Sequence, residues 1–337
     1  TASADEPQAN NTTDDDGETE GGDSTAESER PDNAPRTYAG IVTGPDGKPL
    51  EGALISAINL TFKRDENRYL TKTLATTKSA ADGSYSIHFQ FEEGGNRILA
   101  ELPGFGTDVT KFLRLQELFQ QNKAELNLHL TKEKRIAGRV VDMEGNPIQG
   151  VKVKLVEIVL PTSREAVDKW VVNARPDLLK GRNDFIMMSH DPRITETQFP
   201  GRETIDEPLD GGAEIETNAD GEFQWEGIGE DCLVQFKLSG PTIATRDALI
   251  VTREMPSILA FNHRIRDNDY THYGASPTII ADPTQPITGV VVDADSELPL
   301  AGLNVVVARI GKSNWRVPRV MATTDDEGRF QLNGLPL

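Results

Sequence analysis

Residues 137–151 of the chain, AGRVVDMEGNPIQGV, recur in two further copies, 39–53 (AGIVTGPDGKPLEGA) and 288–303 (TGVVVDADSELPLAGL). The shared pattern is G-x-V-x-[D/G]-x-x-G-x-P-[L/I]-x-G-[A/V/L]. Its two outer glycines are 12 residues apart in the first two copies and 13 apart in the third, where Glu297 and Leu298 stand in place of the inner glycine. Repetition on this scale indicates one structural unit per copy.

Each copy has a matching second half built around an acidic residue followed by glycine. Runs of alternating polar and apolar residues flank this dipeptide, a pattern typical of a tight β-hairpin whose glycine adopts positive φ. The three segments are 77–86 (TKSAADGSYS), 217–224 (TNADGEFQ) and 323–331 (TTDDEGRFQ). Many short strands separated by Gly and Pro turns predict an all-β chain of tandem β-sandwich modules.

The repeated pattern resembles the carboxypeptidase regulatory-like module. The fold of that family is a transthyretin-like β-sandwich of about seven strands, related in architecture to immunoglobulin-like sandwiches. In the family the module is a non-catalytic appendage, named for its place beside the peptidase domain of some carboxypeptidases. It also occurs in bacterial surface and periplasmic proteins. The resemblance therefore implies a repeat protein of the bacterial envelope type.

The domain organisation follows from the repeats and from the composition of the N-terminal segment. Residues 1–37 contain no Val, Ile, Leu, Met, Phe, Trp or Tyr, and carry eleven acidic side chains against two basic ones. Without apolar side chains to bury, this segment is predicted to be a disordered acidic linker. The expected modules are module 1 at 38–133, module 2 at 134–285, and at 286–337 the first half of module 3, truncated from a longer protein.

Module 2 is longer than the others between its first glycine and its acidic-glycine turn. That spacing is 83 residues, against 43 in module 1 and 39 in module 3, which places an insertion near 160–213. Within the insertion, residues 163–174 are expected to form one short helix. Ser163 suits the N-cap, and the apolar positions from Ala166 to Val171 recur on one face.

The overall composition argues against nucleic acid and membrane spans. The net charge is −19, and no basic stripe with interleaved aromatics is present, so nucleic acid is not an expected partner. No apolar run approaches the 18 or more residues that a spanning helix needs. No Ser, Cys or Thr lies in a G-x-S-x-G elbow, and neither H-E-x-x-H nor a P-loop motif occurs.

The single cysteine, Cys232, is predicted to be a structural residue. It opens the alternating segment 232–238 (CLVQFKL), in which every second residue faces the same side of a strand. A free cysteine in this setting behaves as a small apolar core residue. A reactive thiol would need a helix terminus or a cationic neighbour, and the sequence around Cys232 provides neither.

Two patterns in the sequence resemble metal sites. Residues 216–221 (ETNADG) resemble the start of a calcium-binding loop, but Gly227 stands where a bidentate glutamate is required, so a turn is expected. Two imidazoles and two phenols lie within eleven residues and suit ferric iron; they are His263, Tyr270, His272 and Tyr273. Such ligands are usually spread through a fold, and we expect this segment to be a polar connection between modules 2 and 3.

Two other constellations are compatible with ligand binding. Some transthyretin-like hydrolases use paired histidines, and His88 and His129 both lie on strand-like segments, although their alternation predicts solvent-facing side chains. A sugar-stacking platform would need exposed tryptophans. Trp225 alternates with Phe223 and is expected in the core, Trp170 lies in the predicted helix, and Trp315 is the best exposed candidate.

These observations predict a non-catalytic structural or interaction protein with no catalytic, cofactor-binding or metal-binding residues. Its expected role is to space or dock a neighbouring domain at the cell envelope, with a protein or glycan as partner and by strand addition as one route. The alternatives are an accessory region of a larger enzyme, such as a peptidase whose catalytic domain lies outside this chain, and a carbohydrate-binding module. The expected location is extracytoplasmic: periplasmic, cell-surface or secreted, including as the soluble part of a membrane-anchored protein.

Overall fold

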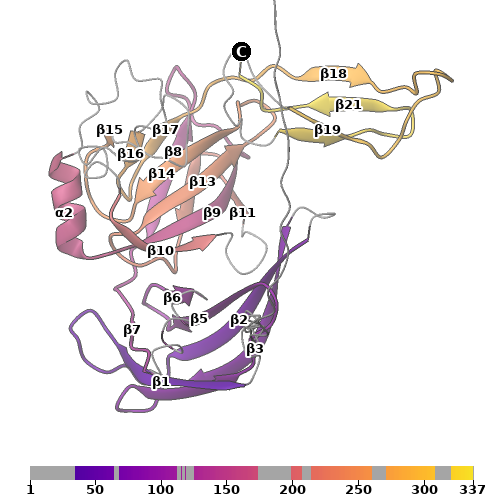
Figure 1. The fold of residues 1–337 in the computed structure, drawn as a ribbon. Helices are drawn as coiled ribbons and strands as arrows, with labels where there is room; N and C mark the ends of the chain where they lie inside the picture. Colours follow the sequence, from indigo (N-terminus) through magenta and orange to yellow (C-terminus); the bar gives the residue numbers. More distant parts are fainter. Residues whose placement is uncertain are drawn as a thin grey trace, which may run out of the picture. The chain divides into compact units, whose positions relative to one another are not determined.

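The computed structural model describes residues 35–63, 68–111, 115, 118, 125–173, 199–206, 214–259, 271–307 and 320–336. They all belong to one unit, Ala34–Leu337. They form six β-sheets, and one helix is described over its whole length (Figure 1). The predicted all-β class with sandwich modules is thereby confirmed. Most of the expected acidic linker, residues 1–34, lies outside the described residues.

Module 1 is a sandwich of two sheets. One sheet has the strand order β4-β1-β7, and the other has the order β3-β2-β5-β6. The strands are β1 Arg36–Thr43, β2 Leu54–Lys63, β3 Arg68–Lys78, β4 Ser84–Phe89, β5 Gly95–Glu101, β6 Asp108–Lys111 and β7 Leu128–His129. Alternate side chains of β4 are buried between the sheets, as the sequence pattern predicts.

The first strand begins inside the segment expected as linker. β1 starts at Arg36, and the side chain of Arg36 is buried with its guanidinium 4.9 Å from the ring centre of Phe91. This cation–π contact stabilises the charged Arg36 side chain in a buried position at the edge of the core. The linker was predicted from the absence of apolar residues, and this criterion does not detect a buried arginine. The predicted linker therefore extended two residues too far, because Arg36 and Thr37 belong to β1.

Module 2 repeats the two-sheet plan and enlarges one sheet. Its smaller sheet has the order β12-β8-β17, and its larger sheet has the order β10-β9-β13-β14-β16-β15, with β11 also paired to β9. The strands are β8 Ile136–Val141, β9 Lys152–Pro161, β10 Gly201–Asp206, β11 Glu214–Glu216, β12 Glu222–Trp225, β13 Leu233–Ser239, β14 Arg246–Val251, β15 Ile258–Leu259, β16 Thr271–Tyr273 and β17 Thr278–Ile280. β10 and β11 together occupy the edge of β9 that β3 occupies on β2 in module 1.

The insertion supplies the predicted helix. Helix α2, Arg164–Asn173, begins after Ser163, whose hydroxyl accepts a hydrogen bond from the Ala166 N–H at 3.1 Å. Val167 and Trp170 are buried, and they pack in one cluster with Leu233, Leu249 and Val251. α2 therefore covers the face of the larger sheet opposite to the sandwich core (Figure 1).

Module 3 consists of two strand pairs in the described residues. β18 Ile287–Val290 pairs with β21 Arg329–Leu332, and β19 Asn304–Val306 pairs with β20 Met321–Thr323. Its apolar cluster is small, with three buried members: Val320, Leu332 and Leu335. Counterparts of β5, β6 and β7 are absent from the described part of this module.

The acidic-glycine turns join two sheets and do not close long hairpins. Gly83, Gly221 and Gly328 have φ of 75°, 73° and 68°, as expected for this tight turn. However, the strands on either side pair with different partners: β3 pairs with β2, whereas β4 pairs with β1. The hairpin prediction is wrong beyond the turn, because a strand's alternation does not specify its neighbour.

The three modules share one hydrogen-bonded motif, which we call the hydroxyl clamp: the side chains of Ser79, Thr217 and Thr324. In module 2 the Thr217 hydroxyl donates to the Ile148 carbonyl at 2.7 Å and accepts from the Val151 N–H at 2.9 Å. The same two bonds are made by Ser79 to Leu50 and Ala53, and by Thr324 to Leu300 and Leu303. The clamp fixes the Pro-containing turn to the strand that precedes each acidic-glycine turn.

Candidate functional site

The boundary between modules 1 and 2 is a strand-like segment, 131–134, that is hydrogen-bonded on both sides. On the side of module 1, the Gly106 N–H donates to the Thr131 carbonyl at 3.0 Å. On the side of module 2, the Glu230 N–H donates to the Lys132 carbonyl at 2.8 Å, and the Gly227 N–H donates to a Glu133 carboxylate oxygen at 2.6 Å. We call 131–134 the first junction.

The second junction, 282–285, lies between modules 2 and 3 and repeats this scheme. The Ala244 N–H donates to the Asp282 carbonyl at 2.8 Å, as Gly106 does at the first junction. The Gly334 N–H donates to the Thr284 hydroxyl at 3.1 Å, as Gly227 does to Glu133. Two boundaries made from different residues thus use the same bonds.

A cavity of about 580 Å³ lies beside the first junction. Its wall includes residues of both modules and of the start of α2, among them Asp108, His129, Lys132, Arg164 and Arg202. A cavity of this kind in the described part of the chain is a candidate ligand site, and the state of its charged groups decides what chemistry it can perform.

The buried carboxylate in this cavity wall is engaged by structural partners. Asp108 accepts hydrogen bonds from the N–H groups of Val109 at 2.9 Å and His129 at 2.7 Å, and it is paired with the Arg202 guanidinium. Asp108 belongs to module 1 and Arg202 to β10 of module 2. This ion pair therefore ties the two modules together, and both carboxylate oxygens of Asp108 accept from protein donors.

A second buried carboxylate, Asp231, also has a cationic partner. The Arg253 guanidinium contacts Asp231 at 2.8 Å and Asp168 of α2 at 2.7 Å. Burial raises the pKa of Asp231, and the nearby Arg253 opposes that rise. The neighbouring Cys232 is fully buried in the cluster with Val234, as predicted, and burial raises the pKa of its thiol to about 12. A thiol with such a pKa is protonated at neutral pH and is a poor nucleophile.

The two predicted histidines on module 1 are not brought together. His88 and His129 are exposed, and their Nδ1 atoms hydrogen-bond Thr37 at 2.8 Å and Thr43 at 3.1 Å. Both threonines lie on β1, six residues apart in sequence, which corresponds to roughly 20 Å along a strand. A paired-histidine site is therefore not formed by these residues.

The segment whose side chains suit ferric iron is partly a strand of module 2. His272 lies on β16, which pairs with β14 and β15 inside the larger sheet, so the expectation of a connection between modules is wrong there. The His272 ring is buried against Trp170, with ring centres 5.2 Å apart and planes at 76°. Tyr273 is half-buried, while His263 and Tyr270 lie outside the described residues.

The sequence that resembles a calcium loop uses its oxygen atoms within the turn. The Asn218 side-chain oxygen accepts from the N–H groups of Asp220 at 3.0 Å and Glu222 at 2.9 Å. The Thr217 hydroxyl belongs to the clamp. Across the described residues, no group of three or more His, Cys, Asp or Glu side chains is placed to hold a metal ion.

The tryptophans of module 2 face the interior. Trp225 is buried as predicted, with its ring centre 5.2 Å from that of Phe236. Trp170, on α2, is buried against the larger sheet. Neither ring is available to stack on a sugar. Trp315, the exposed candidate from the sequence, lies outside the described residues.

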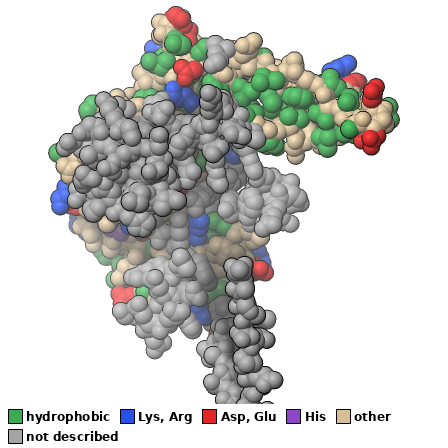
Figure 2. Space-filling model, turned by 45° about the horizontal axis from the view of Figure 1, so that its top comes forward, with side chains coloured by type: hydrophobic (Ala, Val, Ile, Leu, Met, Phe, Trp, Pro, Cys, Tyr) green, Lys and Arg blue, Asp and Glu red, His purple; other side chains and the backbone are tan. Residues whose placement is uncertain are grey.

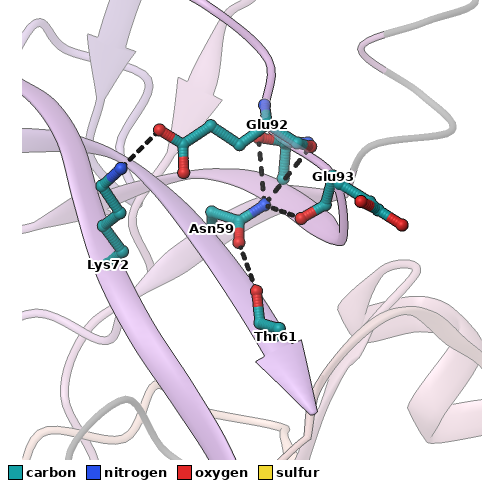
Figure 3. Close-up of polar contacts among 6 residues, drawn as sticks. Asn59, Thr61, Lys72, Glu92 and Glu93 are labelled. Carbon is teal, nitrogen blue, oxygen red and sulfur yellow. Dashed lines mark hydrogen bonds and ion pairs between the residues drawn. The ribbon is translucent and has the colours of Figure 1, made fainter. Parts of the chain in front are cut away.

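A polar cluster inside module 1 also proves to be structural (Figure 3). Asn59 on β2 and Asn96 on β5 are buried side by side, and the Asn59 amide donates to the Asn96 side-chain oxygen at 3.4 Å and to the Glu93 carbonyl at 3.2 Å. The Asn96 amide donates to the Glu92 carbonyl at 2.7 Å. Lys72 contacts the Glu92 carboxylate from β3. These bonds hold the turn before β5, and they were not predictable from any motif.

The most distinctive surface is on module 3. Figure 2 shows hydrophobic side chains gathered at the upper right over the segment that carries β18, β19 and β21. Exposed large apolar residues concentrate there: Ile287, Val290, Val292, Leu298, Leu303, Val306 and Met321. In modules 1 and 2 the first strand is covered by a later strand of the same module, β7 and β17 respectively.

Comparisons with known proteins give no family. Neither a protein-family model nor a curated protein matches the chain, so the resemblance to the carboxypeptidase regulatory-like module stays a prediction. Among solved structures, the shaft pilin SpaA from Lactobacillus rhamnosus GG is similar at 10% identity and a TM-score of 0.23, covering 74% of this chain and 98% of that chain. A streptococcal ancillary pilin has 11% identity and a TM-score of 0.19, with 89% and 87% of the two chains covered.

The full-length pilus protein RrgB from Streptococcus pneumoniae is similar at 10% identity and a TM-score of 0.21, covering 74% of this chain and 47% of that one. Similarity this weak supports no inference about function. Within the described residues, no helix is long and apolar enough to span a membrane.

Proposed function

We propose that the chain is a non-catalytic structural array whose modules hold a neighbouring domain or partner at a set distance, outside the cytoplasm. The observation that carries this proposal is the repeated junction. Two module boundaries made from different residues use equivalent backbone and side-chain hydrogen bonds. A flexible linker would need no such bonds, whereas a spacer gains a fixed geometry from them.

The charged groups near the cavity support a structural role over a catalytic one. Asp108 and Asp231, the two buried carboxylates there, each have an arginine partner that comes from a different element. Removing one member of such a pair leaves an uncompensated buried charge, so the pairs favour one arrangement of the elements that carry them. The resemblance to modules of bacterial envelope proteins supports the extracytoplasmic location.

The distance between two spin labels, measured by pulsed electron resonance, tests the spacing role. Labels at Lys48→Cys in module 1 and Met143→Cys in module 2 would occupy exposed turns, while Cys232 stays unlabelled because it is buried. We expect one narrow distance distribution. A broad distribution for the otherwise unaltered chain would contradict the proposal.

Substitution at the junction sharpens this test. Glu133→Ala removes the acceptor of the Gly227 N–H and should broaden the distribution. Glu226→Ala, at an exposed neighbouring position, serves as the matched control and should leave the distribution unchanged. Equal behaviour of the two variants would show that the junction bond does not set the spacing.

A further inference from the structure

The first and last strands of modules 1 and 2 lie side by side and run parallel. In module 1, β7 pairs with β1, so that Val42 and Thr43 face Leu128 and His129. In module 2, β17 pairs in the same way with β8. The chain therefore enters each module at the start of one strand of the pair and leaves it at the end of the other. Because the strands are parallel, these two points lie at opposite ends of the pair.

This arrangement determines how a pull along the chain acts on each module. A pull on the two ends of the module draws the parallel strands past each other, so that all the hydrogen bonds between them are loaded at once. A pull on neighbouring ends of the two strands would load the same bonds one after another. Within the described residues, β7 is strand-paired to β1 alone and β17 to β8 alone. The parallel pair is therefore the strand ladder that takes up the tension.

The hydrogen bonds of the pair in module 1 are spread along its length. The Leu126 N–H donates to the Ala39 carbonyl at 2.8 Å, and the Leu130 N–H donates to the Thr43 carbonyl at 2.9 Å. Leu126 and Leu130 are both buried. Their burial shields these bonds from water, which would otherwise compete for the same donors and acceptors.

Module 2 forms the same kind of pair from different residues. The Ala137 N–H donates to the Ala275 carbonyl at 2.9 Å, and the Ala281 N–H donates to the Val141 carbonyl at 2.8 Å. Ala275, Val141 and Ala281 are buried. The parallel pair is thus a shared feature of both modules and does not depend on one set of side chains.

The first glycine of the repeated pattern lies within this pair. It is Gly40 on β1 and Gly138 on β8. A Cβ at Gly40 would lie 2.0 Å from the Leu126 carbonyl oxygen, and a Cβ at Gly138 would lie 2.3 Å from the Phe223 ring and 3.0 Å from the Pro277 side chain. A residue without a Cβ is needed for neighbouring strands to approach this closely. The motif that defines the repeat therefore supplies the close approach on which the parallel pair depends.

We propose that modules 1 and 2 bear tension, which passes along the chain as shear between their first and last strands. The first junction connects the end of β7 to the start of β8, so the pull that leaves one parallel pair enters the next at the equivalent point. This function goes beyond the spacing role, because a spacer at rest needs no resistance to stretching.

Force spectroscopy of single molecules of the full chain, pulled between two introduced cysteines, tests this function. Pro35→Cys with Lys132→Cys applies the pull at opposite ends of the β1–β7 pair. Pro35→Cys with Glu125→Cys applies it at neighbouring ends of the same pair and is the matched control. The three positions are exposed, whereas the native Cys232 is buried and does not react with the handles. Both attachments release roughly 300 Å of chain when module 1 unfolds, so the two unfolding events can be compared directly.

We expect the pull at opposite ends to need a force larger by about twofold or more, since the bonds share the load. Asn127→Ala removes the side-chain oxygen that accepts from the Ile41 N–H of β1, and it should lower the force in this geometry. Thr37→Ala removes a side-chain bond on the other edge of β1, to His88 of β4, and it should leave the force unchanged.

Two results would overturn the proposal: equal forces in the two pulling geometries, or equal effects of Asn127→Ala and Thr37→Ala. Neither result bears on the label distances that test the spacing role, because those distances are measured without load.

Discussion

Modules 2 and 3 are built on the same turns and the same hydroxyl clamp, yet they bury very different amounts of their first strand. Thr217 and Thr324 make equivalent pairs of hydrogen bonds, and the donor–acceptor distances agree, at 2.9 and 2.7 Å in both. Ile136 is fully buried, whereas Ile287 is half exposed. β13 and β17, which cover β9 and β8 of module 2, have no counterparts in the described part of module 3.

The comparison separates what local sequence determines from what distant strands determine. The clamp bond of Thr324 spans 24 residues, and it forms although the module has no full core. In module 2 the cover of β8 comes from β17, more than a hundred residues further along the chain. The equivalent clamp bond of Thr217 spans 69 residues, so the clamp forms at either separation, while burial of the first strand depends on strands further along the chain.

The largest expected difference between the modules is the cost of truncating an equivalent core residue. Ile136→Ala should lower the stability of module 2 by about 2–5 kcal/mol, because it opens a cavity in a closed core. Ile287→Ala should cost about 1 kcal/mol or less, since much of that side chain is already in water. Hydrogen exchange of peptides from β8 and β18 would report each module separately.

If the two substitutions had equal costs, the side chain of Ile287 would be covered as well as that of Ile136. The contrast between a closed and an open module would then be wrong.

Removal of the clamp hydroxyl should lower the stability of modules 2 and 3 by similar amounts. Thr217→Val keeps the shape of the side chain but leaves the Ile148 carbonyl and the Val151 N–H without their partner, which should cost about 2–4 kcal/mol. We expect Thr324→Val to destabilise module 3 in the same way, and Thr76→Val, exposed on β3, to have little effect. Hydrogen exchange of the backbone amides around each clamp measures these losses of stability. A loss confined to module 2 would mean that the clamp needs a closed core.

Much of this local structure could be predicted from the sequence. The repeat indicated the Gly-containing turns, and the capping serine with its periodic apolar residues predicted the helix to within one residue at each end. The alternation around Cys232 correctly assigned it to the core with Val234 and Phe236. All of these signals come from residues close in sequence.

Other features depend on contacts that the sequence does not display. The hairpin prediction failed because alternation shows that a strand is half buried and not which strand it pairs with. Asp108 and Arg202 are 94 residues apart, and no motif links them. The clamp has one signal in the sequence: Ser79, Thr217 and Thr324 each lie four residues before the turn glycine of their module.

The smallest expected effect is the pH dependence of stability that comes from one aspartate in the first turn of module 2 and one in the first turn of module 3. Asp142 in module 2 has a lowered pKa because the Asn146 side chain hydrogen-bonds its carboxylate, and Asp293 in module 3 has a lowered pKa because the Ser296 N–H does so. A carboxylate with a lowered pKa in the folded state contributes stability above its unfolded pKa, and that contribution is lost as the pH falls through the folded value. The loss should therefore begin below about pH 3.9 in both modules.

Carboxyl titration by NMR would test this in the two modules at once. If the turns form independently of the core, Asp142 and Asp293 should both titrate below the ordinary value for aspartate, although one lies in a closed module and the other in an open one. If Asp293 alone titrated at the ordinary value, the Asp293–Ser296 bonds would be absent in solution. Module 3 would then lack the turn that links β18 to β19 in this structure.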